Sequence, residues 1–344
     1  MDRKTGLTPI FTFGVLEKIS EATESQQTLE ARMKTYELMQ DQQLRSDAPV
    51  ILRLDGYSFR KFLVAFATPF DQRLHDAMVN TCSDLLNFLP TATTAYTQSD
   101  EITLVFPTGV CCSSTKRVQK ILSLAAAYAS VRFNMHLTMA VAAAPEPYVG
   151  MLTDLFGRAF FHGKLFAVPS IGEALNCLIW RCREDAVRNS VIAFAKTLFS
   201  KEELDGKTTD EVLEMMKTEK NVIYEKAVPS WAIEGTTVKK ELFEHKGFNR
   251  KTGRTVKTAE VRLRAVDKGV REFSDENLKM MTALYWGPRA EDETQFKGKT
   301  RAWVEAWVAE TDDESKTAVQ MKTEEVEMKT EDEISLKDWL AEYD

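Results

Sequence analysis

The pattern of hydrophobic positions between residues 49 and 89 predicts a buried strand followed by a helix. The run 49–59, PVILRLDGYSF, is apolar from Val50 to Leu54 and then reaches Asp55-Gly56, which suits the end of a strand. Apolar residues recur at helical spacing over 71–89, and Asp71, after a proline, suits the N-cap position. A strand, a turn and an amphipathic helix are therefore expected in that order.

The following segments extend this into a six-element pattern. Residues 91–106 predict a β-hairpin with its turn near 98–101, and a second long helix is predicted to start after Thr115 and to run to about 136. A strand at 164–170 precedes a helix of about 171–199, where Ser170 and Glu173 suit a capping box. The order β-α-β-β-α-β is the split βαβ, or ferredoxin-like, plan. We therefore predict an α+β fold, palm-like, with an antiparallel sheet and helices on one face.

Composition changes along the chain and indicates how it is divided. Residues 1–28 are weakly patterned and are expected to form an arm, and residues after 200 look like an appended helical region of the same catalytic unit. The last segment is acidic, low in apolar residues and expected to be mostly disordered. The expected divisions are 1–28, 29–200, 201–309 and 310–344.

The net charge of −7 belongs to one end of the chain. Residues 310–344 carry 13 acids and 4 lysines, a net −9, so the other 309 residues carry about +2 (−7 minus −9). An acidic total therefore does not exclude a basic groove for nucleic acid on the body of the protein.

Other compositional features bound the class of protein. No apolar run approaches the length of a membrane span. The five cysteines, at 82, 111, 112, 177 and 182, show no zinc spacing. We expect an intracellular protein, most simply a cytoplasmic one, with reduced thiols and no membrane partner.

Two carboxylates from neighbouring strands are expected to meet at one end of the sheet, although Asp55-Gly56 alone would suit an ordinary turn. Asp55 ends the first strand, and Asp100 and Glu101 lie at the hairpin that pairs with this strand in a split βαβ sheet. Oxygen ligands gathered in this way suit Mg²⁺, and Gly56 lets its backbone carbonyl approach the ion. Alternation along the strand predicts that Asp100 is the metal ligand while Glu101 points away and orients the hairpin or a water.

Cations at the start of the second long helix predict a phosphate site. Lys116, Arg117 and Lys120 lie where positive charge opposes the helix dipole, and cations beside free N–H groups favour an anionic ligand. A solvated helix face is the alternative reading of the same residues. Ser99 is a further candidate donor to phosphate, with simple turn chemistry as its alternative.

The helix at 171–199 carries polar residues in two places. Asn189 falls in line with the apolar positions 178, 182 and 186, which predicts a buried amide that either ties two elements together or contacts a ligand. A polar stripe along the same helix suits either a solvated salt-bridge face or a site. Its members are Arg181, Glu184, Asp185 and Arg188.

Several motifs together resemble the tRNA(His) guanylyltransferase family over about 29–290. They are RMKTYE, RLDGYSF, FATPFDQRL, AYTQSDEITLVF, KRVQK, VPS…LIWRCREDAVRNS and EKN. The resemblance implies a palm-like nucleotidyltransferase that extends RNA in the 3′–5′ direction with Mg²⁺, usually two ions. It also implies ATP and GTP or another NTP as substrates, tRNA as partner, and a homo-oligomer, either tetramer or dimer.

Residue by residue, the resemblance gives roles to positions of this chain. Asp55, the Gly56 carbonyl and Asp100 look like metal ligands, with Glu101 as the neighbouring essential acid. The remaining matches suit nucleotide binding. They are Arg53, Asp71, Ser99, Lys116, Arg117, Lys120, Asn189, Lys220 and Asn221.

Departures from the family pattern point to one branch of it. The His-Ile-Asn-Asn segment of the guanylyltransferases proper is AVRN here, so Ala186 replaces its histidine and only Asn189 matches. Thr68, His162 and Lys164 replace a lysine, an aspartate and an arginine. The DAVRNS form looks like the Thg1-like branch, which implies template-dependent repair of tRNA 5′ ends.

Three other functions stay open on the sequence. The chain could add G to the 5′ end of tRNA(His), or it could be a nucleotide cyclase built on a similar palm, although cyclase recognition residues are not apparent. It could also be an RNA-binding relative with reduced catalysis, which the substitutions at Thr68, His162 and Ala186 would explain.

Overall fold

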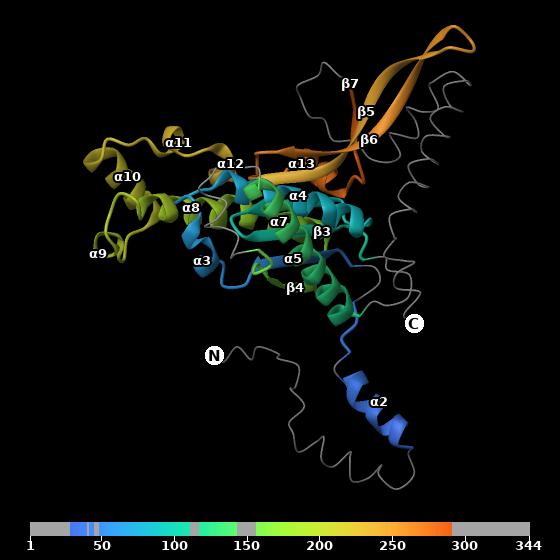
Figure 1. The fold of residues 1–344 in the computed structure, drawn as a ribbon, viewed down its shortest axis with the longest axis horizontal. Coiled ribbons are helices and arrows are strands. Elements are labelled where there is room, and N and C mark those ends of the chain that lie inside the picture. Colours follow the sequence, from blue (N-terminus) through green and yellow to red (C-terminus); the bar gives the residue numbers. More distant parts are fainter. Residues whose placement is uncertain (1–27, 40, 45–47, 111–116, 143–155, 291–344) are drawn as a thin grey trace, which may run out of the picture.

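The computed structural model describes residues 28–290, apart from 40, 45–47, 111–116 and 143–155 (Figure 1). The expected arm at 1–28, except its last residue, and the whole acidic tail lie outside the described residues, as does Lys116. Within the described part, no helix combines the length and apolar character needed to cross a membrane.

The predicted palm is confirmed at the centre of the molecule. Its four strands pair antiparallel in the order β4-β1-β3-β2, with the first strand between the hairpin and the last strand. This is the strand order of a split βαβ unit. The elements are β1 (Val50–Gly56), α4 (Gln72–Phe88), β2 (Thr94–Gln98), β3 (Glu101–Phe106), α5 (Val118–Ala142) and β4 (Phe161–Ala167).

Helices α4 and α5 cover one face of this sheet. Alternate residues of β1, Val50, Leu52 and Leu54, belong to the same core as the buried sides of both helices, which include Met78 and Phe133. Since strand residues two apart share a face, the residues between them must face the other way. The expected packing of two helices on one face is therefore present.

The prediction that helices cover only one face is wrong. Ile51 of β1 and Val105 of β3 pack on the opposite side against α7 (Ile171–Trp180) and α13 (Asp275–Thr282), through residues such as Leu178 and Met281. Strand β1 is central and its first five residues are almost all fully buried, so both of its faces need cover.

The helix expected at 171–199 is interrupted by a π-helical turn. Helix α7 continues through this turn, Arg181–Asp185, into α8 (Ala186–Ala195). A π turn holds more residues than an α turn, so it rotates everything after it relative to α-helical spacing. Ser190 is consequently buried at 1% exposure while Asn189 is exposed, which corrects the prediction of a buried Asn189.

Short helices follow and form a small core of their own with α8. They bury Val212, Met216 and Tyr224 against Val191 and Ala195. These helices are α9 (Lys201–Leu204), α10 (Thr209–Glu219), α11 (Tyr224–Ala227) and α12 (Ser230–Glu234). Earlier in the chain lie α2 (Leu29–Met39) and α3 (Phe59–Phe62), the latter followed by a 3₁₀ turn, Leu63–Ala65.

The appended region contains strands as well as helices. Strand β5 (Thr236–Asn249) pairs with β2 and continues the palm sheet, and β6 (Arg254–Val266) pairs with β5 along its whole length. Strand β7 (Trp286–Ala290) pairs with β5 in parallel. Lys239 of β5 is fully buried, a position from which its amine donates to the carbonyl of Thr93 at 2.7 Å and to that of Ala283.

Candidate active site

The three predicted carboxylates lie at one end of the sheet. Asp55 near the end of β1 and Glu101 at the start of β3 are directly opposite each other in the antiparallel ladder. Asp100 lies in the two-residue turn between β2 and β3, and its carbonyl accepts a hydrogen bond from the Gly56 N–H at 3.0 Å. The strand pairing and the hairpin turn thus place Asp100 and Glu101 beside Asp55.

The hairpin turn, not strand alternation, separates the roles of Asp100 and Glu101. Residues directly opposite in a ladder share a face, so Glu101 lies on the same face as Asp55 rather than pointing away. Ser99 adopts a left-handed conformation (φ 56°), and its hydroxyl donates to Asp100 Oδ1 at 3.1 Å. The turn therefore sets the position of the Asp100 carboxylate.

The electrostatics of Asp100 favour a bound cation. Burial raises the pKa of this carboxyl above its ordinary 3.8, and the nearby charge of Asp55 raises it further, against the lowering effect of the Ser99 hydroxyl and its own N–H. Two carboxylates in a partly buried place repel each other, and a positive ion between them would relieve that repulsion.

Gly56 is needed because an aromatic ring lies against its Cα. A Cβ at this position would lie 2.4 Å from the Phe59 ring. That ring is buried and contacts Phe62, Phe133 and Phe161, with centroids between 5.2 and 5.4 Å away, so it has little freedom to move. Glycine thus lets the chain turn from β1 into α3 directly beside the carboxylates.

Glu101 forms an ion pair with Arg181, a member of the polar stripe singled out in the sequence. Arg181 on the π-helical turn forms ion pairs with both Glu101 and Asp185, and Arg188 also pairs with Asp185. Burial lowers the pKa of Arg181, and the like charge of Arg53 lowers it too, yet a guanidinium stays protonated at neutral pH. The polar stripe of this helix was the available signal, and its solvated reading is wrong for Arg181 and Asp185, which are buried.

Two further side chains surround the Asp55 carboxylate. His162 lies opposite Asp55 on β4, with its Nε2 3.6 Å from Asp55 Oδ2, and its side chain is 57% exposed. Arg53 lies on the same face of β1 as Asp55, and its guanidinium is 5.9 Å from the Trp180 ring centroid. The open side of the site thus presents an imidazole and a guanidinium to solvent.

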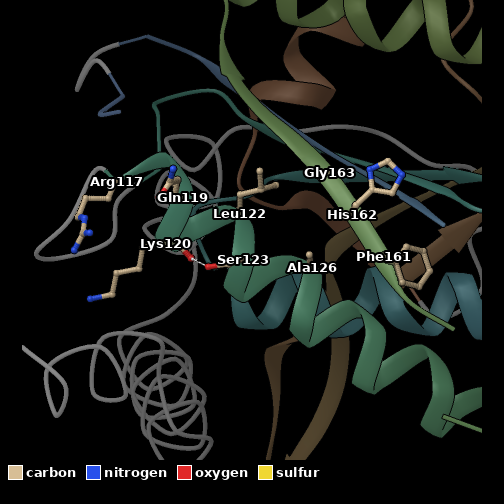
Figure 2. A pocket seen from close by; sticks show the side chains of 9 residues that line it. All are labelled: Arg117, Gln119, Lys120, Leu122, Ser123, Ala126, Phe161, His162 and Gly163. Atoms are coloured by element: carbon tan, nitrogen blue, oxygen red, sulfur yellow. Dashed lines mark hydrogen bonds between the residues drawn. The ribbon is translucent and has the colours of Figure 1, made fainter. Parts of the chain in front are cut away.

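A hollow of about 710 Å³ lies along β4, between this strand and the start of α5 (Figure 2). Arg117 and Lys120 lie at its helical end and His162 at its strand end. Helix α5 packs on one face of the sheet, whereas Asp55 and His162 lie on the other face. The hollow therefore extends around the edge strand β4, from α5 to His162. Its lining residues are Arg117, Gln119, Lys120, Leu122, Ser123, Ala126, Phe161, His162 and Gly163.

Arg117, at the helical end of this hollow, is held by the segment that follows α2. Arg117 donates through Nε to Asp41 at 2.8 Å, and its backbone bridges Gln43 just after α2. Lys120 lies one turn further along α5, with Lys116, the third predicted cation, outside the described residues. The segment before β1 therefore fixes the start of the cationic helix.

Asp71 has a structural place in the fold. It caps α4, and its carboxylate accepts from the N–H groups of Arg73 and Ala67, both at 2.9 Å, and from the Arg73 guanidinium. Burial would raise its pKa, but these hydrogen bonds and the Arg73 charge outweigh burial and lower it. Its side chain is 3% exposed, so its contacts are those of a helix cap.

The other predicted nucleotide-binding residues are exposed and lie on or at the end of the helices that follow the palm. Asn189 is on the outer side of α8, and Lys220 and Asn221 end α10 in the helical part of the appended region. The Lys220 amine lies 4.9 Å from the Phe199 ring centroid, and Asn221 is left-handed at φ 52°. The described contacts do not bring these three residues to Asp55.

The donor set fits magnesium rather than a zinc cage. Among the residues that the structure describes, no group of three His, Cys, Asp or Glu side chains could hold a metal by itself. Mg²⁺ is commonly held by one or two carboxylates, with waters and phosphates completing its octahedron. Asp55, Asp100 and the Gly56 carbonyl supply such an incomplete oxygen set.

Several known proteins are similar to this chain. The family model for tRNAHis guanylyltransferase matches residues 30–169, which include β1 to β4. An uncharacterised protein of Acanthamoeba polyphaga mimivirus is 31% identical over 227 residues, 62% of this chain and 77% of that protein. A solved structure, a bacterial tRNA(His) guanylyltransferase (Thg1)-like protein in complex with ATP, is 29% identical with a TM-score of 0.52, covering 62% of this chain and 88% of that one. Residues 30–169, which contain the palm, thus match the tRNAHis guanylyltransferase family, whose members are nucleotidyltransferases.

Proposed function

We propose that this protein adds nucleotides to the 5′ end of tRNA in the 3′–5′ direction, copying the opposite strand by Watson–Crick pairing. The observation that carries the proposal is the meeting of Asp55 and Asp100 at the end of the sheet, in a chain whose palm matches this family. The bacterial Thg1-like protein in complex with ATP supports a nucleoside triphosphate as one substrate.

The proposed reaction has two balanced steps. The tRNA 5′-monophosphate attacks the α-phosphorus of ATP, and pyrophosphate leaves. The 3′-OH of the incoming nucleotide then attacks the activated 5′-phosphorus of the tRNA, its proton is lost to solvent, and AMP leaves. Both steps are in-line displacements at phosphorus, so positioning and charge stabilisation are the main tasks of the protein.

Asp55, Asp100 and the Gly56 carbonyl would hold the magnesium ions. Two Mg²⁺ would make the attacking 3′-OH more acidic and would stabilise negative charge on the attacking and leaving oxygens. The residues around them position these ligands. Arg181 holds Glu101 at the start of β3, and the Ser99 hydroxyl holds the Asp100 carboxylate.

The cationic end of the hollow would bind phosphate groups. Arg117 and Lys120 line it, and a polyphosphate lying along β4 from these cations would end near His162 and Asp55. Cations and the first N–H groups of a helix together favour such an anion. Arg53 beside Trp180 is available to a base or ribose on the open side of the site.

The form of the helix after β4 supports 5′-end repair over addition of G to tRNA(His). Ala186 is 2% exposed and lies directly after the π-helical turn, where the guanylyltransferases proper carry a histidine. A buried methyl group cannot read a nucleotide there. A panel of 5′-truncated tRNAs tests this proposal, with repair of several tRNAs expected. Addition of G to tRNA(His) alone would favour the guanylyltransferase alternative.

The catalytic proposal is tested by Asp55→Ala. We expect nucleotide addition to be lost while far-UV circular dichroism and the unfolding midpoint stay near those of the wild type. Asp76→Ala is the matched control, because Asp76 is an exposed acid on α4 that accepts from Gln72 at 2.8 Å. Wild-type-like addition by Asp55→Ala would overturn the proposed role of this carboxylate.

A further inference from the structure

Strands β5 and β6 form a ribbon that extends beyond the palm sheet (Figure 1). Strand β2 pairs with β5 only as far as Val238, and β7 pairs with β5 only as far as Glu244. Beyond Glu244, therefore, the described ladder consists of β5 and β6 alone. We call residues 245–258 the ribbon tip.

Charge is distributed differently at the two ends of this ribbon. Near the sheet, acids have basic partners: Arg264 pairs with Glu241 and Arg262 with Glu260, both at 3.0 Å. The ribbon tip contains no Asp or Glu but five exposed cations, so its own sequence supplies no neutralising acid. They are Lys246, Arg250, Lys251, Arg254 and Lys257.

The strand register makes this charge unfavourable for an isolated hairpin. Lys246 lies directly opposite Lys257, and like charges directly opposite in a ladder destabilise the pairing. An anionic partner at the ribbon tip would reverse the sign of this interaction. The register thus indicates a surface that is completed by negative charge from elsewhere.

The acidic end of the same chain starts beside this surface. Strand β7 runs parallel to β5, and its last residue, Ala290, is the ladder partner of Glu244, so the chain leaves the described part beside the ribbon tip. Residues 310–344, which we call the acidic tail, carry 13 acids and 4 lysines.

Reach does not limit contact between the two segments. The ribbon from Glu244 to Arg250 is about 20 Å long at the rise of a strand. The 20 residues from 291 to 310 span roughly 30 Å as a helix and at most about 70 Å when extended. Either conformation brings the first acids of the tail to the ribbon tip.

We propose that the acidic tail docks on the ribbon tip of its own chain. Tethering keeps the tail at an effective concentration near millimolar, which favours this occupant over a free anion. The tail then competes with other polyanions for the ribbon tip. Only the identification of RNA as such a competitor rests on the function proposed above; the docking itself does not.

Zero-length carbodiimide coupling of the full chain tests the docking. We expect peptides that join lysines of the ribbon tip to acids of the tail, and at least a fivefold loss of these peptides in Lys246→Glu/Lys257→Glu. The control Lys201→Glu/Lys217→Glu makes the same charge change at exposed helical lysines and is expected to leave the coupling unchanged. Failure to recover tip-to-tail peptides from the wild type would overturn the proposal.

Binding of a short RNA duplex separates tail docking from a ribbon that serves RNA alone. Changing six tail acids (324, 325, 327, 331, 332 and 333) to their amides should tighten duplex binding about fivefold at low salt. This gain should disappear in the Lys246→Glu/Lys257→Glu background. Duplex binding could instead be unchanged by the six amide substitutions and weakened by Lys246→Glu/Lys257→Glu. That result would show that the ribbon tip binds RNA without competition from the tail, and it would overturn the proposal. Neither the coupling nor the binding measurement needs catalysis. A failure of the proposed function would therefore not by itself produce the results that overturn tail docking.

Discussion

Asp55 and Glu101 face each other across one rung of the sheet, yet their surroundings differ. Asp55 is 42% exposed beside His162, whereas Glu101 is paired with the buried Arg181. A carboxylate already paired with a guanidinium has less capacity for a metal ion than one facing solvent and a second acid. The partners of these residues, rather than their spacing in the sequence, divide their roles.

The Arg181–Glu101 pair should be strongly coupled. Arg181→Met leaves two carboxylates without their shared partner and should cost about 3–5 kcal/mol of unfolding free energy. Combining Arg181→Met with Glu101→Gln in a double-mutant cycle should give a coupling free energy of about 1–3 kcal/mol. Urea unfolding of the four proteins measures this, with the exposed Arg183→Met as control. Additive effects would show that the two side chains act independently.

Asp71 should stabilise the fold in a pH-dependent way. Its pKa is lowered in the folded state, so its contribution is present above the unfolded value near 3.8 and is lost as pH falls through the folded pKa. Asp71→Asn should cost about 1 kcal/mol or more at neutral pH, and the difference from wild type should shrink in acid. Unfolding curves at several pH values measure this. A pH-independent difference would contradict it.

At the scale of elements, the strongly periodic segments were predictable and the irregular ones were not. Strand β1 and helix α4 follow their apolar patterns, and Asp71 caps α4 as expected. The course of the ribbon was not predicted because Lys239 and Glu241 look exposed in the sequence but are buried. Lys239 donates to the carbonyl of Thr93, and Glu241 accepts from Arg264 on the neighbouring strand β6. Such tertiary partners leave no local signal.

The π-helical turn is the other irregular element, and it changes what the next helix presents. Tyr224 donates to the Ser190 hydroxyl at 2.7 Å inside the small helical core. Asn189 was expected to be buried because the prediction used constant α-helical spacing, whereas Ser190 takes that position. Arg181 was not recognised as a partner of Glu101 because that ion pair joins residues 80 positions apart.

A pair of neighbouring substitutions tests this register. Ser190→Ala leaves the Tyr224 hydroxyl without its partner and should cost about 1–3 kcal/mol. Asn189→Ala changes an exposed side chain and should alter stability by less than about 0.5 kcal/mol. Thermal and urea unfolding measure both. A larger loss of stability for Asn189→Ala than for Ser190→Ala would indicate an uninterrupted α-helical register instead.

On the scale of the whole molecule, α5 presents an apolar outer side that the described residues do not cover. Val131, Met135 and Met139 follow one another at i,i+4 spacing with exposures of 67%, 36% and 64%. The buried side of this helix packs on the sheet, so the helix has apolar residues both on that side and on its outer side. We expect a second copy of the chain to cover the outer side, which is consistent with the predicted homo-oligomer.

Light scattering of Val131→Lys/Met139→Lys checks this expectation. Two charges in an apolar contact should lower the average mass, because each would be buried without a partner. Asn80→Lys/Asn87→Lys, at exposed positions of α4, is the matched control and should leave the mass unchanged. An unchanged mass in the α5 variant would place self-association elsewhere.

Lys239 has a further consequence for how the molecule opens. Its single amine binds the carbonyls before β2 and after α13, within the sheet that β2 and β5 share. Opening the C-terminal strands alone would expose this amine's partners and one face of the palm. In a hydrogen-exchange measurement, the backbone amides of β2 and β5 should therefore exchange together through global unfolding. The amides of α9 and α10 should exchange through smaller, local openings.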